Sequence, residues 1–285
     1  MNYNEITISL VLFRSEKVVF QCLKSINNKI KKIIIFDNSN DSVLKKIINK
    51  KYPNINYILS KKNIGFGAAH NKVIKLAKTP YVFVLNPDTI LDKNCIKELI
   101  NGSNKVSNNF EVISPLEKSN NYGFFENIYE KRLNNKTIID VDFVKGFSML
   151  IKKSKVNYFD DNFFLYLEEI DLCKRIKIRK KKIFIIKKSK IRHLEAKSSN
   201  IGFEFEKCRN WHWMWSKVYY NIKHKNFFYV LSKVFFVILF NFIKGALFLL
   251  FNKKKSLIYF LRVLGATSAL FGRKSSYRPK LHPLV

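Results

Sequence analysis

Short apolar runs alternate with amphipathic segments through the N-terminal half of the chain. The apolar runs predict strands, and the segments between them predict helices. Several runs are apolar throughout, which is typical of parallel strands covered by helices on both faces. The pattern therefore predicts an α/β fold with a doubly wound, mostly parallel sheet flanked by helices. We expect strands at Ile6–Phe13, Ile33–Phe36, Ile55–Leu59, Tyr81–Leu85 and Val112–Ile113, and helices at Lys17–Ile26, Val43–Lys50, Ala68–Lys78 and Lys93–Ile100.

The second half of the chain departs from this alternation. Residues 117–138 are polar and irregular, which predicts an insertion or a lid, and from Glu204 onward the sequence becomes aromatic and helical. We therefore expect an α/β domain at residues 1–203 and a helical region at residues 204–285. Between the two, strand character is expected at Val141–Lys152, Ile183–Ile186 and Ile191–His193, and a basic helix at Leu172–Arg179.

Polar segments follow four of the expected strands, at Arg14–Glu16, Asp37–Asp41, Ser60–Asn71 and Asn86–Thr89. In a doubly wound sheet, ligands bind outside the carboxyl ends of the strands. Polar groups that converge there are what a nucleotide site needs. These segments therefore predict the position of a binding site.

Two of these segments carry specific chemistry. Gly65 and Gly67 join a strand to a helix, where the backbone can approach a phosphate closely. The segment lacks the third glycine of the dinucleotide fingerprint and lies on the third strand, which argues against a Rossmann dehydrogenase; an ordinary glycine turn is an equally good interpretation. Asp37 offers a carboxylate to the imide N–H of uracil or thymine, or it forms a solvated Asx turn.

Acidic residues gather at two further places. Glu168, Glu169 and Asp171 follow an aromatic run and begin an expected helix, a setting in which a buried carboxylate can serve as a general base. An isolated cluster of this kind would favour ordinary N-terminal helix acids. Its pairing with Asp88, at the end of an apolar run, favours a base and a metal site instead. Mg²⁺ or Mn²⁺ bridging a diphosphate needs only one or two protein carboxylates, and His193 is a candidate partner, although a lone histidine is more often structural.

The formal net charge of +32 suggests nucleic acid or an anionic membrane as a partner. The chain is rich in Lys, Asn and Ile, as an A+T-rich genome would produce, so much of the lysine is explained without a partner. No zinc-knuckle, RNP or recognition-helix pattern supports nucleic-acid binding, and we expect none. The cysteines Cys22, Cys95, Cys173 and Cys208 have no metal-site spacing, and the N-terminus shows no signal peptide; both favour a cytoplasmic location.

Taken in order, these segments resemble the inverting nucleotide-sugar glycosyltransferases of family 2, which have the GT-A fold. The most similar subset is the bacterial rhamnosyltransferase-like enzymes that build O-antigen and other surface polysaccharides. The resemblance covers roughly Ile6 to Ser199. It rests on the first strand, Asp37-Asn38-Ser39, Asn63–Asn71, Leu85–Asp88, Gly146, the Phe159–Arg175 block and His193.

The resemblance implies roles for individual residues. Glu169 would be the catalytic base, at a position where the family more often has Asp. Asp88 would be the metal carboxylate, with Asn86 in place of the first acid of the family's Asp-x-Asp, and His193 would reach the metal. The donor-binding residues would be Asp37, Asn63, Gly65, Gly67, Asn71, Asn86 and Asp88, and the acceptor-side residues Gly146, Glu168 and Asp171.

The C-terminal quarter contains a long apolar segment, Asn226–Phe251, interrupted by Lys233, Asn241 and Lys244. The two lysines are eleven residues apart and share a helix face, and each would be costly near the centre of a bilayer. We therefore expect this helix, with a second at Ser256–Phe271, to lie in the cytoplasmic leaflet through snorkelling lysines and anionic headgroups. A transmembrane span is the runner-up, and packing on the catalytic domain or in a homodimer is the further alternative. The nearby Trp211, Trp213, Trp215, Tyr219 and Tyr220 suit an interfacial belt or a core.

The sequence thus predicts a membrane-associated inverting glycosyltransferase at the cytoplasmic face of a bacterial inner membrane. It would transfer a sugar, L-rhamnose from a dTDP-activated donor being the favoured one, to a lipid-linked glycan, with Mg²⁺ or Mn²⁺ as cofactor. The alternatives are another donor, such as a galactofuranosyl or N-acetylhexosaminyl nucleotide, and a non-catalytic membrane-surface assembly protein that keeps the fold.

Overall fold

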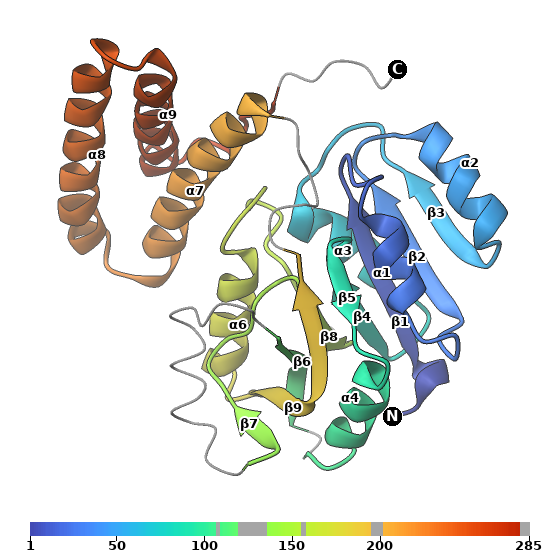
Figure 1. The fold of residues 1–285 in the computed structure, drawn as a ribbon. Helices are drawn as coiled ribbons and strands as arrows, with labels where there is room; N and C mark the ends of the chain where they lie inside the picture. The colour runs from blue at the N-terminus through green and yellow to red at the C-terminus, as the bar shows by residue number, and fades with distance from the viewer. Residues whose placement is uncertain (107–108, 119–135, 155–157, 195–201, 280–285) are drawn as a thin grey trace.

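The strands predicted in the N-terminal half lie side by side in one sheet. A computed structural model describes residues 1–106, 109–118, 136–154, 158–194 and 202–279. Its sheet has nine strands in the order β3-β2-β1-β4-β8-β6-β9-β5, with β7 paired to β9 (Figure 1). The first four are parallel to one another: β1 (Ile6–Leu12), β2 (Lys32–Asp37), β3 (Ile55–Leu59) and β4 (Tyr81–Leu85).

Helices cover both faces of this sheet, as the apolar strands predicted. The even-numbered residues of β1 pack with α1 (Val19–Ser25), α2 (Ser42–Lys51) and α4 (Cys95–Ser103). The opposite face of the sheet packs against α3 (Phe66–Leu76) and α6 (Glu168–Ile178). The two faces bury separate apolar cores, so the carboxyl ends of the strands are held rigidly at one edge.

The remaining strands are mixed in direction. They are β5 (Thr89–Leu91), β6 (Phe110–Glu117), β7 (Ile138–Asp140), β8 (Ser148–Lys152) and β9 (Lys182–His193). β8 is antiparallel to both β4 and β6, whereas β6 and β9 are parallel. The sheet is thus parallel in its N-terminal half and mixed beyond β4.

Three boundaries differ from those predicted. β9 is one continuous strand, because a register shift between Pro115 and Leu116 of β6 accommodates the polar residues that separated the two predicted strands. The strand expected at Val141–Lys152 is confined to β8, since residues 141–147 connect it to β7. α6 begins at Glu168, four residues before the predicted start at Leu172, so all three acids lie in its first turn. Most of the predicted lid, residues 119–135, lies outside the described residues.

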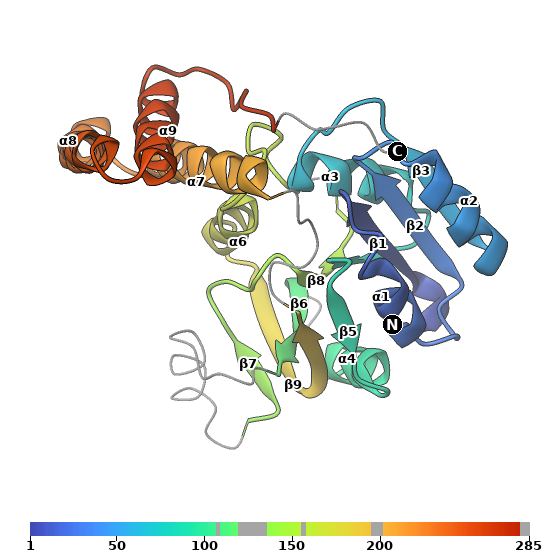
Figure 2. The same cartoon turned by 45° about the horizontal axis from the view of Figure 1, so that its top comes forward.

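Three long helices follow: α7 (Phe203–His224), α8 (Phe227–Leu249) and α9 (Lys253–Leu270). They lie side by side (Figure 2). They pack on one another around a third apolar core, to which Phe163 of the α/β part also contributes. Trp211 and Trp215 lie in that core, whereas Trp213 is 44% exposed. Because the helices share a core residue with the preceding part, the domain boundary at residue 203 stays a prediction.

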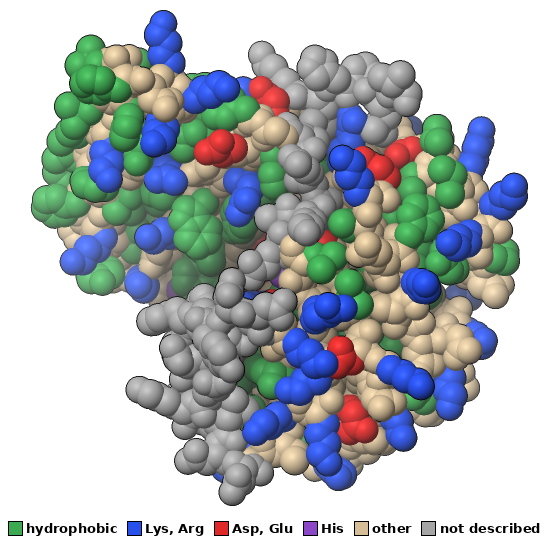
Figure 3. Space-filling model, viewed as in Figure 1, with side chains coloured by type: hydrophobic (Ala, Val, Ile, Leu, Met, Phe, Trp, Pro, Cys, Tyr) green, Lys and Arg blue, Asp and Glu red, His purple; other side chains and the backbone are tan. Residues whose placement is uncertain are grey.

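α8 presents an apolar face to solvent. Phe228 is 77% exposed, Phe236 66% and Phe251, just beyond the helix, 82%. Of the helices in the described ranges, α8 alone has the length and apolar composition to cross a membrane. Figure 3 shows hydrophobic side chains gathered over the end of the molecule that contains α8, bordered by Lys and Arg.

Candidate active site

A cavity of about 140 Å³ lies at the carboxyl edge of β1–β4. It is lined there by Asn38 after β2, Asn63 and Gly65 after β3, and Asn86 after β4. Its other walls come from later in the chain and include Phe164 and Pro279. Three predicted donor-binding residues, Asn63, Gly65 and Asn86, therefore meet at one cavity.

Asp37 organises the turn beside this cavity. Its side chain is fully buried, and its carboxylate accepts hydrogen bonds from the backbone N–H groups of Ser39 (2.7 Å) and Asp41 (2.9 Å) and from Tyr57 Oη (2.9 Å). Burial raises the pKa of Asp37, against the opposing effect of these hydrogen bonds. The carboxylate shapes the loop after β2, and its contact with a nucleobase stays a prediction.

The glycine turn before α3 serves the protein's own packing. Gly65 has φ of +92°, and a β-carbon there would lie 2.5 Å from the carbonyl oxygen of Phe164. A β-carbon at Gly67 would lie 2.8 Å from Cβ of Phe159. The close approach expected for a phosphate is thus made by residues 159–164 of the same chain. Gly65 also borders the cavity, but Gly67 is not among the residues that line it.

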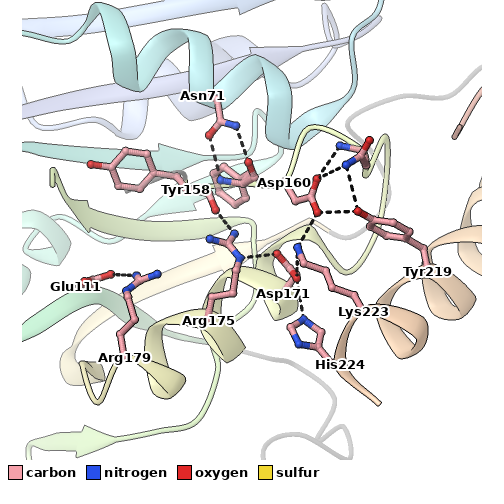
Figure 4. Close-up of polar contacts among 12 residues, drawn as sticks. Asn71, Glu111, Tyr158, Asp160, Asp171, Arg175, Arg179, Tyr219, Lys223 and His224 are labelled. Carbon is pink, nitrogen blue, oxygen red and sulfur yellow. Dashed lines mark hydrogen bonds and ion pairs between the residues drawn. The ribbon is translucent and has the colours of Figure 1, made fainter. Parts of the chain in front are cut away.

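Asn71 is placed differently from its predicted donor-binding role. Its carboxamide accepts a hydrogen bond from Phe159 N (3.1 Å) and donates to Phe159 O (2.8 Å) and to Asp161 Oδ1 (2.7 Å). It faces a second cavity, of about 940 Å³, which is also lined by Arg175 and Lys223 (Figure 4). The amide is occupied in fixing the segment that leads to the acidic residues, which makes Asn71 a positioning residue.

Asp88, which is buried, pairs with the partly exposed His193. The register of β5 and β9 places Thr89 opposite His193, and His193 Nε2 lies 3.2 Å from Asp88 Oδ1. Asp88 is 1% exposed, and the Phe147 ring stacks on His193 with the ring centroids 4.4 Å apart. Two residues that are distant in the sequence are thus held side by side by strand pairing.

These residues fit a divalent cation that is completed by a diphosphate. Asp88 supplies a carboxylate and His193 an imidazole, and Asn86 Oδ1 is buried without a hydrogen-bond partner among the described residues. The described ranges contain no cluster of three or more His, Cys, Asp or Glu able to hold a metal. A cation here would therefore take further oxygens from the substrate phosphates, as Mg²⁺ and Mn²⁺ often do.

Glu169 lies against Gly146. A β-carbon added at Gly146 would come within 3.3 Å of Cβ and Cγ of Glu169, and the residue after Gly146 is Phe147, which stacks on His193. The helix that carries Glu169 follows two residues with left-handed backbone, Tyr166 and Leu167, with φ of 73° and 67°. Such a conformation is costly for non-glycine residues and occurs most often at functional sites. The chain thus turns sharply to place Glu169 against Gly146, one residue before the ring that stacks on His193.

Glu168 points into the protein. It is 3% exposed, its Cβ lies 3.5 Å from the position of a β-carbon at Gly67, and its Oε2 has no hydrogen-bond partner in the described part of the chain. Burial raises the pKa of Glu168 well above its usual value, and the neighbouring charge of Glu169 adds to this. Burial also raises the pKa of Glu169. Glu169 is only partly buried, however, whereas Glu168 is buried. Glu169 is therefore better placed than Glu168 to meet a substrate.

The carboxylate of Asp171 faces α7. Its carboxylate lies 2.8 Å from each of three nitrogens, Arg175 Nε, Lys223 Nζ and His224 Nε2 (Figure 4). Burial would raise the pKa of Asp171, but the hydrogen bonds from Lys223, Arg175 and His224 outweigh it and lower that pKa. Since the carboxylate is occupied by these basic side chains, we revise its acceptor-side role to a structural one.

Other contacts were not foreseen from the sequence. Lys223 also pairs with Asp160 at 2.6 Å, so α7 is tied to the segment before α6. The stacking of Phe147 on His193 and the contribution of Pro279 to the cavity were likewise unexpected. No local pattern signals these contacts, because each joins segments that are distant in the sequence. Those of Lys223 and Pro279 also depend on how α7–α9 dock on the sheet.

Residues 7–185 match the family model described as Glycosyl transferase family 2. The chain belongs to this family. It is 27% identical over 196 residues to the low-salt glycan biosynthesis hexosyltransferase Agl10 of Haloferax volcanii, covering 60% of this chain and 61% of that protein. It is also 27% identical over 211 residues to the rhamnosyltransferase WbbL of Escherichia coli strain K12, covering 64% and 78%.

The fold is also similar to a solved glycosyltransferase. The mannosyltransferase PcManGT from Pyrobaculum calidifontis, in complex with GDP-Man and Mn²⁺, superposes with a TM-score of 0.60 at 9% identity, covering 95% of this chain and 88% of that one. The match confirms the predicted GT-A architecture, a mixed α/β sheet with flanking helices. The family match and the fold thus agree on a glycosyltransferase family with the GT-A architecture.

Proposed function

We propose that the protein is a metal-assisted, inverting glycosyltransferase whose catalytic base is Glu169. The observation that carries this proposal is the contact of Glu169 with Gly146, the residue before Phe147, whose ring stacks on His193 of the Asp88–His193 pair. An acid that can take a proton is thus connected, through two consecutive residues, to groups suited to a cation.

In this mechanism Glu169 accepts the proton of the acceptor hydroxyl as that oxygen attacks the anomeric carbon. The new C–O bond forms on the face opposite the breaking bond to the phosphate oxygen, so the anomeric configuration inverts and a nucleoside diphosphate leaves. A divalent cation held by Asp88 and His193, with help from Asn86, would neutralise charge on the leaving diphosphate. Asn71 and Gly67 act indirectly, by fixing residues 159–161 ahead of Glu169.

We propose L-rhamnose from dTDP-rhamnose as the transferred sugar. The similarity to WbbL, a rhamnosyltransferase, supports this choice, whereas Agl10 is named only as a hexosyltransferase. Asp37, Asn63 and Gly65 would hold the donor nucleotide at the cavity. Galactofuranosyl and N-acetylhexosaminyl nucleotides are the alternative donors.

We further propose that α8 and α9 lie at a membrane surface, where the acceptor would be a lipid-linked glycan. The exposed phenylalanines of α8 supply an apolar face, and Lys253, Lys254 and Lys255 at the start of α9 are all exposed. Such a combination suits an interfacial helix on anionic lipids at the cytoplasmic face. A homodimer through the same face is the alternative and would be seen as a concentration-dependent change in mass.

The direct experiment is to incubate purified full-length protein with dTDP-rhamnose and the alternative donors and to measure release of nucleoside diphosphate. We expect release from one donor, stimulated by Mn²⁺ or Mg²⁺. A non-catalytic assembly protein that keeps the fold would release none from any donor.

A further inference from the structure

The last described residues of the chain, 272–279, form an ordered strap along α7 and end at the cavity; we call them the C-terminal strap. The strap leaves α9 and runs toward the carboxyl edge of the sheet (Figures 1 and 2). Chain termini are usually poorly ordered unless specific contacts hold them. The contacts that hold this one come from buried polar side chains of α7.

His212 is the main attachment. It is fully buried, its Nε2 lies 2.8 Å from the carbonyl oxygen of Tyr277, and its Nδ1 lies 3.0 Å from Ser275 Oγ. Because a carbonyl only accepts, Nε2 carries the proton and Nδ1 accepts from the serine hydroxyl. Trp215 Nε1 also donates to the carbonyl oxygen of Arg273 at 2.9 Å. Three hydrogen bonds from α7 thus fix the path of the strap.

This path brings Arg278 against a residue of the cavity wall, although Arg278 itself is not among the residues that line the cavity. Its guanidinium carbon lies 3.6 Å from the centroid of the Phe164 ring, and both Phe164 and the next residue, Pro279, line the cavity. Arg278 Nη1 donates to the carbonyl oxygens of Ser275 (2.9 Å) and Tyr277 (2.8 Å). The N–H groups on Nε and Nη2 have no hydrogen-bond partner within the described ranges. The guanidinium is therefore oriented and retains donors.

The cavity itself lacks a positive side chain. Among the described residues that line it there is no Lys or Arg. A nucleoside diphosphate carries several negative charges, and an arginine fork matches phosphate oxygens in two-point contact. Stacking on Phe164 keeps the fork planar against the wall at little cost in side-chain entropy.

We propose that Arg278, delivered by the C-terminal strap, binds the diphosphate of the nucleotide donor. The inference rests on the proposed function, and it adds a donor-binding group from outside residues 7–185, the part that matches the family model. The strap then links the helices α7–α9 to donor binding, because His212 and Trp215 set the position of Arg278.

The test compares Arg278→Ala with Arg273→Ala in the full-length protein. Arg273 lies in the same strap, its side chain is exposed, and its contact with α7 is made by its backbone carbonyl. Arg273→Ala therefore removes the same charge as Arg278→Ala and leaves that contact in place. Binding of dTDP, UDP and GDP, each paired with its nucleoside, is measured by calorimetry. We expect Arg278→Ala to weaken binding of the preferred diphosphate about 10-fold, to leave nucleoside binding unchanged, and to differ from Arg273→Ala, which binds like the wild type.

Equal affinity of Arg278→Ala and the wild type for the diphosphate would overturn the inference, and so would equal losses for diphosphate and nucleoside. Tighter binding by Arg278→Ala would also overturn it, by showing that the strap obstructs the cavity. If the wild type binds none of the three diphosphates, the proposed function itself is contradicted, which separates its failure from that of the inference.

Discussion

Glu169 rests on the α-carbon of Gly146, in the space that a side chain at residue 146 would occupy. A β-carbon there would lie 3.3 Å from both Cβ and Cγ of Glu169. The glycine therefore sets the position of the proposed base from the connection between β7 and β8.

This relationship predicts the effect of Gly146→Ala. The added methyl group should displace the Glu169 carboxylate by a few tenths of an ångström and lower the transfer rate roughly 10-fold, since catalysis is sensitive to such misplacement. The loss should be smaller when the variant is made in a Glu169→Asp background, because the shorter side chain relieves the contact. Rate losses that simply add in this double-mutant cycle would show that the two residues are not coupled.

The alternation of apolar strands and helices was sufficient to predict the first four parallel strands and the segments that meet at the cavity. It was not sufficient to predict the contacts of Asn71 or Asp171, because a polar side chain bonds to the partners that tertiary packing places near it. Asn71 is occupied by the backbone of Phe159, and Asp171 by three basic side chains, two of them on α7. The role of Pro279 was equally hidden, since it depends on a terminus held by His212.

Glu168 predicts a dependence of stability on pH. Because burial raises its pKa, the folded state keeps a proton that the unfolded state releases above the usual carboxyl pKa of 4.5. The free energy of unfolding should therefore fall as pH rises from about 4.5 through the raised pKa, by up to about 1.4 kcal/mol per pH unit for one proton.

Glu168→Gln should remove this component, so that the variant gains stability relative to the wild type between pH 5 and pH 8 in urea unfolding. Glu16→Gln, at an exposed position, serves as the matched control, and its free energy of unfolding should vary with pH as that of the wild type does. Parallel pH profiles for wild type and Glu168→Gln would contradict the assignment of a protonated, buried Glu168.

The cation site predicts a difference between two neighbouring variants. Asp88→Ala should abolish the part of nucleoside diphosphate binding that depends on Mn²⁺, whereas Asn86→Ala should weaken it less, because a neutral oxygen contributes less than a carboxylate. Calorimetric titrations with Mn²⁺ and with EDTA measure both effects. Full transfer activity of the wild type in excess EDTA would rule out the metal role of Asp88 and His193.

Membrane association predicts the effect of charge at the start of α9. Replacing Lys253, Lys254 and Lys255 with Glu should weaken binding to anionic vesicles by about 1 kcal/mol or more per residue, with a marked dependence on salt. The control replaces Lys46, Lys50 and Lys51 of α2, which carries the same change in charge at a distance from α8 (Figure 1). Vesicle sedimentation that is equal for both triple variants would show that binding is not localised at α8 and α9.

The most direct test of the account is the transfer rate of Glu169→Gln at saturating donor. Gln keeps the size of Glu but cannot accept the acceptor's proton, so we predict a loss of about 100-fold or more in rate with unchanged donor affinity. A wild-type rate in Glu169→Gln, with the loss found instead in Glu168→Gln or Asp171→Asn, would contradict the assignment of Glu169 as the catalytic base.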